Sequence, residues 1–220
     1  MKEKTQASPW KDIWFRPRRA IGYVIDTNPE HLVFALATAW AFVYAIQKSS
    51  EDSRGDGKDL PELLIIWTFA AVLWGPISVC LHGWIGHWVG TKLGGKCEDS
   101  TRVRAALAWG SIPYIFCIVP LTLIYCLMGF EMFTSEAPRF QEGPDSLLYG
   151  VMGLTCVNIV LWVWSWVATS QTLGEVFGFS AWKGFVVQLS PYLMVFIVVV
   201  GVILASKQSP DSVIRALLGT

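Results

Sequence analysis

Long apolar runs separated by short charged stretches set the strongest limit on how this chain folds. Each run has about 17 residues or more, the lower limit for a helix that crosses roughly 30 Å of hydrocarbon at 1.5 Å per residue. The runs predict an all-α fold, a polytopic membrane bundle of five transmembrane helices preceded by a short amphipathic segment at 1–30. The expected spans within the membrane domain 31–220 are 31–47, 63–89, 105–130, 147–169 and 185–205.

Composition agrees with a membrane protein. The chain is 53% hydrophobic and 15% charged, whereas soluble domains are about 25% charged. The formal net charge is zero, so the chain has no global field that would attract nucleic acid. The expected partners are the lipid bilayer with its anionic headgroups, membrane proteins or a second copy of the chain.

A basic hinge between the second and third runs predicts the orientation. The segment Lys92–Pro113 carries Lys92, Lys96, Arg102 and Arg104 against two acidic residues. Short loops rich in Lys and Arg stay in the cytoplasm. The acidic loops 48–62 and 131–146 then lie outside, and five spans put the N-terminus inside and the C-terminus outside.

The N-terminal segment is basic and amphipathic. Trp10 and Trp14 begin an apolar pattern with steps of three and four residues, Arg16, Arg18 and Arg19 fall mostly off that face, and Pro17 divides the segment. A basic segment with tryptophans on its apolar side is typical of the headgroup layer, where each cation contributes on the order of 1 kcal/mol. The alternative is that both tryptophans pack against the protein's own helices.

Prolines interrupt three of the apolar runs. Pro76, Pro113, Pro120 and Pro191 each remove a helical hydrogen bond and predict a bend. Bent helices are tolerated where they line a cavity. The residues expected at such a cavity are Trp74, Pro76, His82 and Asn158.

Small residues allow two interpretations. The spacings Gly86-x-x-x-Gly90 and Gly174-x-x-x-Gly178 suit close helix approach. The glycines at 90, 94 and 95 also suit the end of the second helix, since glycine commonly follows a helix end. The sequence favours the second interpretation.

Motifs of catalysis and metal binding are absent from the sequence. Cys80, His82 and His87 are the clustered soft-metal ligand types, but the two histidines are about 140° apart on a straight helix, too divergent for one ion. HExxH, GxSxG and phosphate-loop patterns do not occur. No span carries Asp or Glu near its centre, which argues against an ion-coupled pump. We expect no enzyme activity, no cofactor and no metal.

Several segments together resemble a known family. They are Trp-x-x-Ile-Trp-x-Arg-Pro-Arg at 10–18, Asp26-Thr-Asn-Pro29, Lys92-Leu-Gly-Gly-Lys96, the run Arg104 to Pro113, and Leu-Gly-Glu-Val-Phe at 173–177. The chain is similar to the prokaryotic branch of the Yip-domain family, five-span membrane proteins named for interaction with Ypt/Rab GTPases.

The resemblance implies a non-enzymatic helical bundle with a cytoplasmic N-terminus in a prokaryotic plasma membrane. The expected function is to organise membrane or recruit partners through the basic segments. The alternative is a transporter or channel for a small or lipid-like solute through the proline-kinked bundle.

Overall fold

The structure is a computed structural model that describes residues 8–97 and 99–206. These residues form helices and contain no strand, which confirms the all-α prediction. The helices are α1 (Pro9–Phe15), α2 (Pro17–Thr27), α3 (Val33–Glu51), α4 (Leu60–Lys92), α5 (Ser100–Gly110), α6 (Ile112–Ile115), α7 (Ile118–Met128), the 3₁₀-helix η1 (Gly129–Phe133), α8 (Pro138–Gln141), α9 (Asp145–Phe177) and α10 (Ala181–Ser206).

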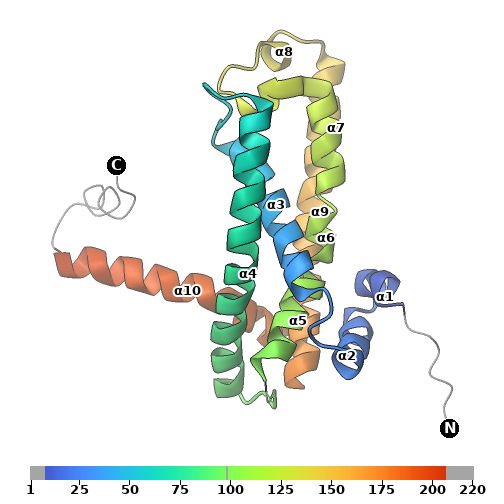
Figure 1. Cartoon of the computed structure of the whole chain (residues 1–220), viewed down its shortest axis with the longest axis vertical. Coiled ribbons are helices and arrows are strands. Elements are labelled where there is room, and N and C mark those ends of the chain that lie inside the picture. Colours follow the sequence, from blue (N-terminus) through green and yellow to red (C-terminus); the bar gives the residue numbers. More distant parts are fainter. Residues whose placement is uncertain (1–7, 98, 207–220) are drawn as a thin grey trace.

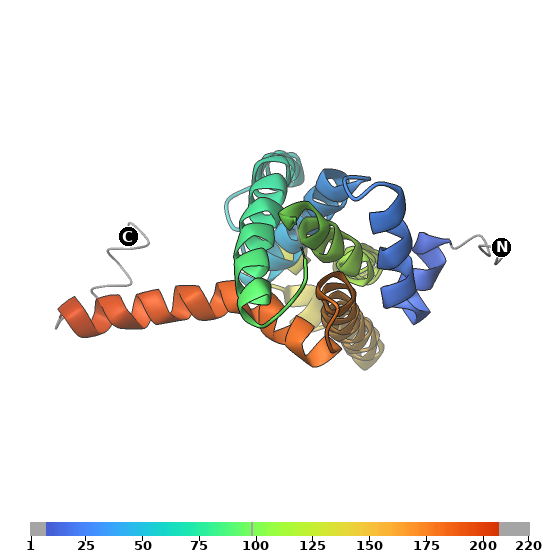
Figure 2. The same cartoon turned by 90° about the horizontal axis from the view of Figure 1, so that it is seen from below.

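The bundle is built from α3, α4, the α5–α7 series and α9, which run along the long axis of the molecule (Figure 1). The helix α10 packs on α9 and α4 with its first half and then extends away from the bundle (Figure 2). Beyond Pro191 its side chains are exposed, and Phe196 and Ile197 are typical.

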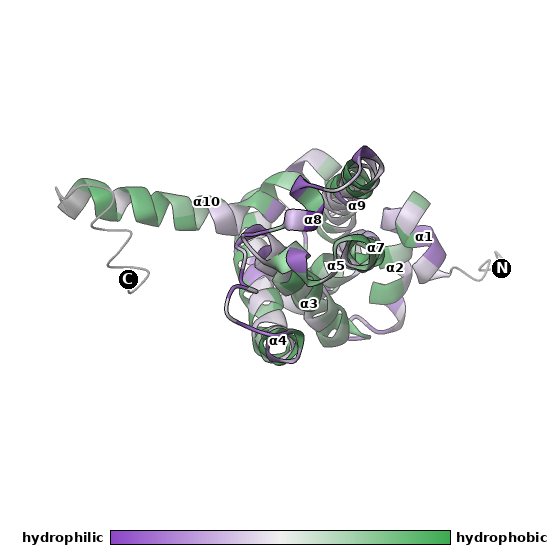
Figure 3. Ribbon diagram, turned by 90° about the horizontal axis from the view of Figure 1, so that it is seen from above, coloured by the Kyte–Doolittle hydropathy of each residue, from purple (hydrophilic) through white to green (hydrophobic). Residues whose placement is uncertain are grey.

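Four stretches are long and apolar enough to cross a membrane: Leu60–Lys92, Ser100–Phe133, Asp145–Phe177 and Ala181–Leu204. Hydrophobic residues extend along α4, α7 and α10 (Figure 3). The expected span 31–47 corresponds to α3, which is not among the four because its 19 residues include Gln47, Lys48 and Glu51. The five-span count therefore stays a prediction. The tail after Lys207, expected outside the cell, lies beyond the described residues.

Two helices, α4 and α9, extend beyond the expected spans 63–89 and 147–169. The helix α9, which corresponds to the fourth expected span, continues past the predicted end at 169. It stops at Phe177, before Gly178, whose φ is +70°. Thr172 and Leu173 are fully buried in this extension, and the Thr172 hydroxyl donates to the Ala106 carbonyl at 2.9 Å. The N-cap of α9 is Pro144, and α4 begins at Leu60, three residues before its expected start at 63, after a capping box.

The capping box at the start of α4 is formed by Asp59 and Glu62. The Asp59 side chain accepts from the Glu62 backbone N–H at 2.9 Å, and the Glu62 side chain accepts from the Asp59 backbone. Pro61 occupies the first turn, where its missing N–H costs nothing. These contacts let α4 start at Leu60, before the apolar run.

The third apolar run is divided into α5, α6 and α7. Pro113 lies in the first turn of α6, and Pro120 lies in the first turn of α7, so each ring falls where the backbone N–H needs no helical partner. By contrast, Pro76 and Pro191 lie inside α4 and α10. The predicted bend in the third run takes the form of breaks after Gly110 and Ile115.

Glycines of α4 lie where other helices approach closely. A Cβ at Gly75 would lie 2.7 Å from the Thr38 Cα, and a Cβ at Gly86 would lie 3.3 Å from Val187. Gly90 packs against the Phe177 ring and lies inside the helix rather than after it. The close-approach interpretation is therefore correct for Gly86 and Gly90, because tertiary packing occupies both positions.

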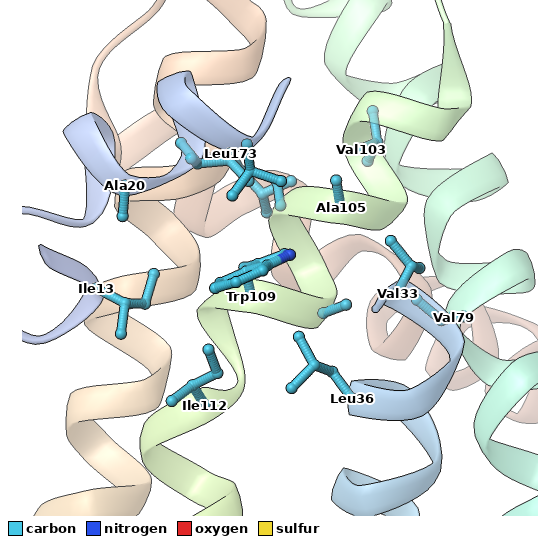
Figure 4. Close-up of a cluster of buried hydrophobic side chains, with 14 of the residues drawn as sticks. Ile13, Ala20, Val33, Leu36, Val79, Val103, Ala105, Trp109, Ile112 and Leu173 are labelled. Atoms are coloured by element: carbon cyan, nitrogen blue, oxygen red, sulfur yellow. The ribbon is translucent and has the colours of Figure 1, made fainter. Parts of the chain in front are cut away.

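A hydrophobic core closes one end of the bundle (Figure 4). Trp109 of α5 lies at its centre and is 1% exposed. The N-terminal segment contributes Ile13, Ala20 and Ile21, each 0% exposed, to the same core. A second core, around Trp67 and Phe133, fills the other end.

Asp56 ties two loops together at the end of the second core. Its carboxylate accepts from the Ser135 backbone N–H at 3.0 Å, and this bond lowers the Asp56 pKa below its ordinary value. A lowered carboxyl pKa adds stability that is present above the unfolded-state pKa, about 3.9, and is lost as the pH falls through the folded-state pKa.

We expect Asp56→Ala to lower the thermal midpoint at pH 7. The difference from wild type should shrink below pH 4, and a constant difference would contradict this assignment.

Candidate functional site

Basic side chains from three distant parts of the sequence lie at one end of the bundle, which we call the basic end. It comprises α1 and α2, the hinge 92–104 and the turn between α9 and α10 (Figure 1). The opposite, acidic end comprises the segments 48–62 and 131–145. The cations of the basic end are Lys11, Arg16, Arg18, Arg19, Lys92, Lys96, Arg102, Arg104 and Lys183.

Contacts hold these three segments together. The Arg18 guanidinium donates to the Phe179 carbonyl at 3.1 Å and pairs with Glu175 at 3.4 Å. The Lys96 backbone N–H donates to the Phe177 carbonyl at 3.1 Å. Lys183 donates to the Leu93 carbonyl at 3.2 Å. The charge of the basic end is therefore displayed on a shared scaffold.

The N-terminal tryptophans pack on the bundle. The Trp10 ring lies 5.1 Å from the Trp109 ring, and the Trp14 ring lies 5.1 Å from the Phe116 ring. Packing against the protein's own helices, the alternative weighed from the sequence, is thus what the structure contains. Phe15, the residue after Trp14, is 88% exposed.

The predicted cations of the basic end divide into two groups. Arg18 makes the contacts above, Arg19 lies 3.5 Å from Asp12, and Arg104 donates to Thr101 at 2.9 Å while its stem covers Gly83. The second group is exposed and forms no side-chain ion pair with another described residue. It consists of Arg16, Lys92, Lys96 and Arg102.

The local structure of the hinge explains its position. Asp99 caps α5 by accepting from the Thr101 backbone N–H at 3.0 Å, and this bond lowers the Asp99 pKa. Gly94 has a φ of +89°, a conformation that side chains rarely adopt. The turn and the cap together direct the chain from α4 back into α5.

The acidic end carries the opposite charge balance. Its cations are Lys48, Arg54, Lys58 and Arg139, and its anions are Glu51, Asp52, Asp56, Asp59, Glu62, Glu131, Glu136, Glu142 and Asp145. Although the chain has no net charge, its charges are therefore separated along the bundle axis, with an excess of cations at the basic end and of anions at the acidic end.

The structure does not bring the candidate metal ligands together. His82 Nδ1 lies 2.8 Å from the Ser78 carbonyl, and His87 Nε2 lies 3.2 Å from the Cys97 carbonyl. The Cys80 sulfur accepts from Arg104 at 3.7 Å. Within the described residues, no group of three His, Cys, Asp or Glu side chains is placed to hold a metal.

A cavity of about 750 Å³ lies between α3, α4, α9 and α10. Of the four residues named from the sequence, Trp74 and His82 line the cavity, whereas Pro76 and Asn158 do not. The Asn158 side-chain oxygen is buried without a hydrogen-bond partner in the described structure. Aromatic residues that sequence reasoning missed form much of the wall: Trp40, Tyr44, Tyr114, Trp162, Trp166 and Tyr192.

Close packing separates this cavity from the basic end. On the side of the cavity nearer the basic end, the residues Val103, Leu173 and Val187 are at most 2% exposed. Gly86 lies against Val103 and Val187, and Gly90 lies against Phe177. The cavity is thus closed towards the basic end.

An all-helical fold with four apolar helices of membrane-spanning length defines a helical membrane protein. The sequence profile of the Yip1 domain matches residues 11–203. The chain therefore belongs to the Yip1 domain family, and the match includes most of the N-terminal segment. Comparisons with curated proteins and with solved structures return no match.

Proposed function

We propose that this protein is a non-enzymatic membrane protein that organises membrane or recruits partners at its basic end. The observation that carries the proposal is the convergence of α2, the hinge and the α9–α10 turn, which displays Arg16, Lys92 and Lys96 together. The surface of the cytoplasmic leaflet is negative, and each nearby Lys or Arg is worth about 1 kcal/mol. Membership of the Yip1 domain family supports the proposal.

The charge asymmetry supports an orientation with the basic end in the cytoplasm, following the positive-inside rule. We propose that the protein resides in a prokaryotic cytoplasmic membrane. Anionic headgroups are the proposed first ligand of the basic end, with membrane-protein partners or a second copy of the chain using the same surface.

Charge reversal tests the proposal. The protein is held in nanodiscs of neutral lipid and floated with liposomes that contain phosphatidylglycerol. Replacing Arg16, Lys92 and Lys96 with Glu is expected to weaken association by about 3 kcal/mol, on the order of 100-fold. High salt should weaken wild-type association as well, because exposed charges are screened.

The matched control reverses the same number of charges at the acidic end, at Arg54, Lys58 and Arg139. This control should bind liposomes as wild type does. Equal loss in both variants, or no loss in the first, would refute the role of the basic end.

A solute pathway is the alternative function. The cavity lined by Trp74 and His82 is the observation in its favour. The packed layer around Val103 and Leu173 argues against passage through the bundle in this conformation. Solute flux into proteoliposomes separates the two functions, since the membrane-organising function requires none.

A further inference from the structure

The cavity has the form of a binding site that ends inside the bundle. Its lining on α3 extends from Ala37 to Glu51, which is about 20 Å at 1.5 Å per residue. Its volume falls within the roughly 300–1,000 Å³ of ligand pockets. Because packed side chains close it towards the basic end, an occupant enters and leaves on the same side.

The rim of the cavity faces sideways. Trp74 of α4, Trp162 of α9 and Tyr192 of α10 line it and are 51%, 47% and 52% exposed. The helices α4 and α9 run along the bundle axis (Figure 1) and are candidate membrane spans, so their exposed flanks face hydrocarbon when they cross a bilayer. An occupant therefore comes from the membrane itself and has an apolar part.

A cluster of uncharged polar groups lies in the half of the cavity nearer the basic end. His82 Nδ1 must donate to the Ser78 carbonyl, 2.8 Å away, since a carbonyl only accepts. In the neutral ring this leaves Nε2 as an acceptor. The Gln188 side-chain oxygen lies 3.1 Å from the Ser170 hydroxyl, and its amide nitrogen is a donor. The Tyr192 ring lies 5.8 Å from the His82 ring.

The charges at the other end of the cavity compensate one another. Lys48 pairs with Asp52 at 2.6 Å and with Glu51 at 3.5 Å, and Arg54 pairs with Asp52 at 2.7 Å. A charged headgroup at the inner cluster would lack an opposite charge there, and burying an unpaired charge is costly. A hydroxyl headgroup suits the cluster, because it both donates and accepts.

We propose that this cavity binds a neutral, hydroxyl-bearing amphiphile with one hydrocarbon chain, of the monoacylglycerol class. Its head hydroxyls bond to His82, Gln188 and Tyr192. Its chain lies along the tryptophans of α3 and α9, such as Trp40 and Trp166. This ligand site is separate from the basic end and does not rest on the function proposed there.

Photolabelling of the detergent-purified full chain tests the site. The probe is a monoacylglycerol with a diazirine in its chain. We expect saturable labelling of peptides that contain 37–51 and 162–169. Unlabelled monoacylglycerol should compete, whereas a fatty acid and an alkyltrimethylammonium of the same chain length should compete at least tenfold less well.

Two variants test the headgroup contacts. Tyr192→Phe and Gln188→Leu should each weaken competition by roughly 2- to 10-fold, the effect of one lost hydrogen bond. Tyr149→Phe is the matched control, because Tyr149 is exposed on α9 outside the lining. Labelling confined to outward faces, or equal competition by the charged analogues, overturns the proposal. If a variant fails to fold, the competition measured on the wild-type protein still tests the proposal.

Discussion

Replacement of Trp109 by Ala is expected to lower the free energy of unfolding by about 3–5 kcal/mol, the usual cost of truncating a buried Trp. Trp109 is 1% exposed, and its ring supports Trp10 at 5.1 Å. Its indole N–H also donates to the His31 carbonyl at 3.2 Å. The substitution therefore removes the platform on which α1 rests and a contact to the segment before α3.

Thermal unfolding in detergent measures the loss, which should lower the midpoint by on the order of 10 °C. Limited trypsin digestion adds a local readout, because release of α1 exposes the bond after Lys11. Trp84→Ala is the control, since Trp84 on α4 is 67% exposed. Similar midpoints and digestion patterns for the two variants would show that Trp109 does not organise this end.

Gly75→Ala is expected to destabilise the α3–α4 crossing by about 1–3 kcal/mol, the typical cost of overpacking. The added Cβ would lie 2.7 Å from the Thr38 Cα and 2.8 Å from the Ala37 carbonyl oxygen. Both are backbone atoms, so a rotamer change cannot relieve the contact and the helices must separate. Because α3 carries Trp40 and Tyr44, the wall of the cavity would shift as well.

Gly153→Ala supplies a matched control for this prediction. Gly153 also lies inside a long helix, α9, and nothing approaches its Cβ position within 4 Å. Alanine there should stabilise the helix by roughly 0.5–1 kcal/mol through lower backbone entropy of the unfolded chain. The two glycine substitutions thus have opposite expected signs in the same thermal assay, and a shared sign would contradict the packing argument.

The helices and the family were predictable from the sequence because their signals are local. Apolar runs bounded by charges located α4, the α5–α7 series, α9 and α10, and dispersed motifs such as Lys92-Leu-Gly-Gly-Lys96 indicated the family. Helix ends were less predictable. The extension of α9 to Phe177 depends on the burial of Leu173 among other helices. The polar residues next to Leu173 in the sequence do not indicate that burial.

The candidate sites were predictable only in part. Arg18 was recognised as a basic side chain, but its hydrogen bond to the Phe179 carbonyl joins positions 161 residues apart. Lys183 of the basic end was not among the predicted site residues because it is the single cation of the stretch 170–184, which the structure places in the first turn of α10. Of the cavity walls, Trp74 and His82 were among the predicted residues, whereas Trp162 and Trp166 were not.

The sequence alone determined that this chain folds as apolar helices with a basic hinge, because length, hydropathy and charge act within each segment. Tertiary structure decided that the basic segments share one end, that Gly75 and Gly90 serve as contact points, and that aromatic side chains surround a cavity closed on one side. Those features depend on which helix faces meet. The free energy of such contacts depends on how well the side chains of distant segments fit together, and the composition of each segment does not determine that fit.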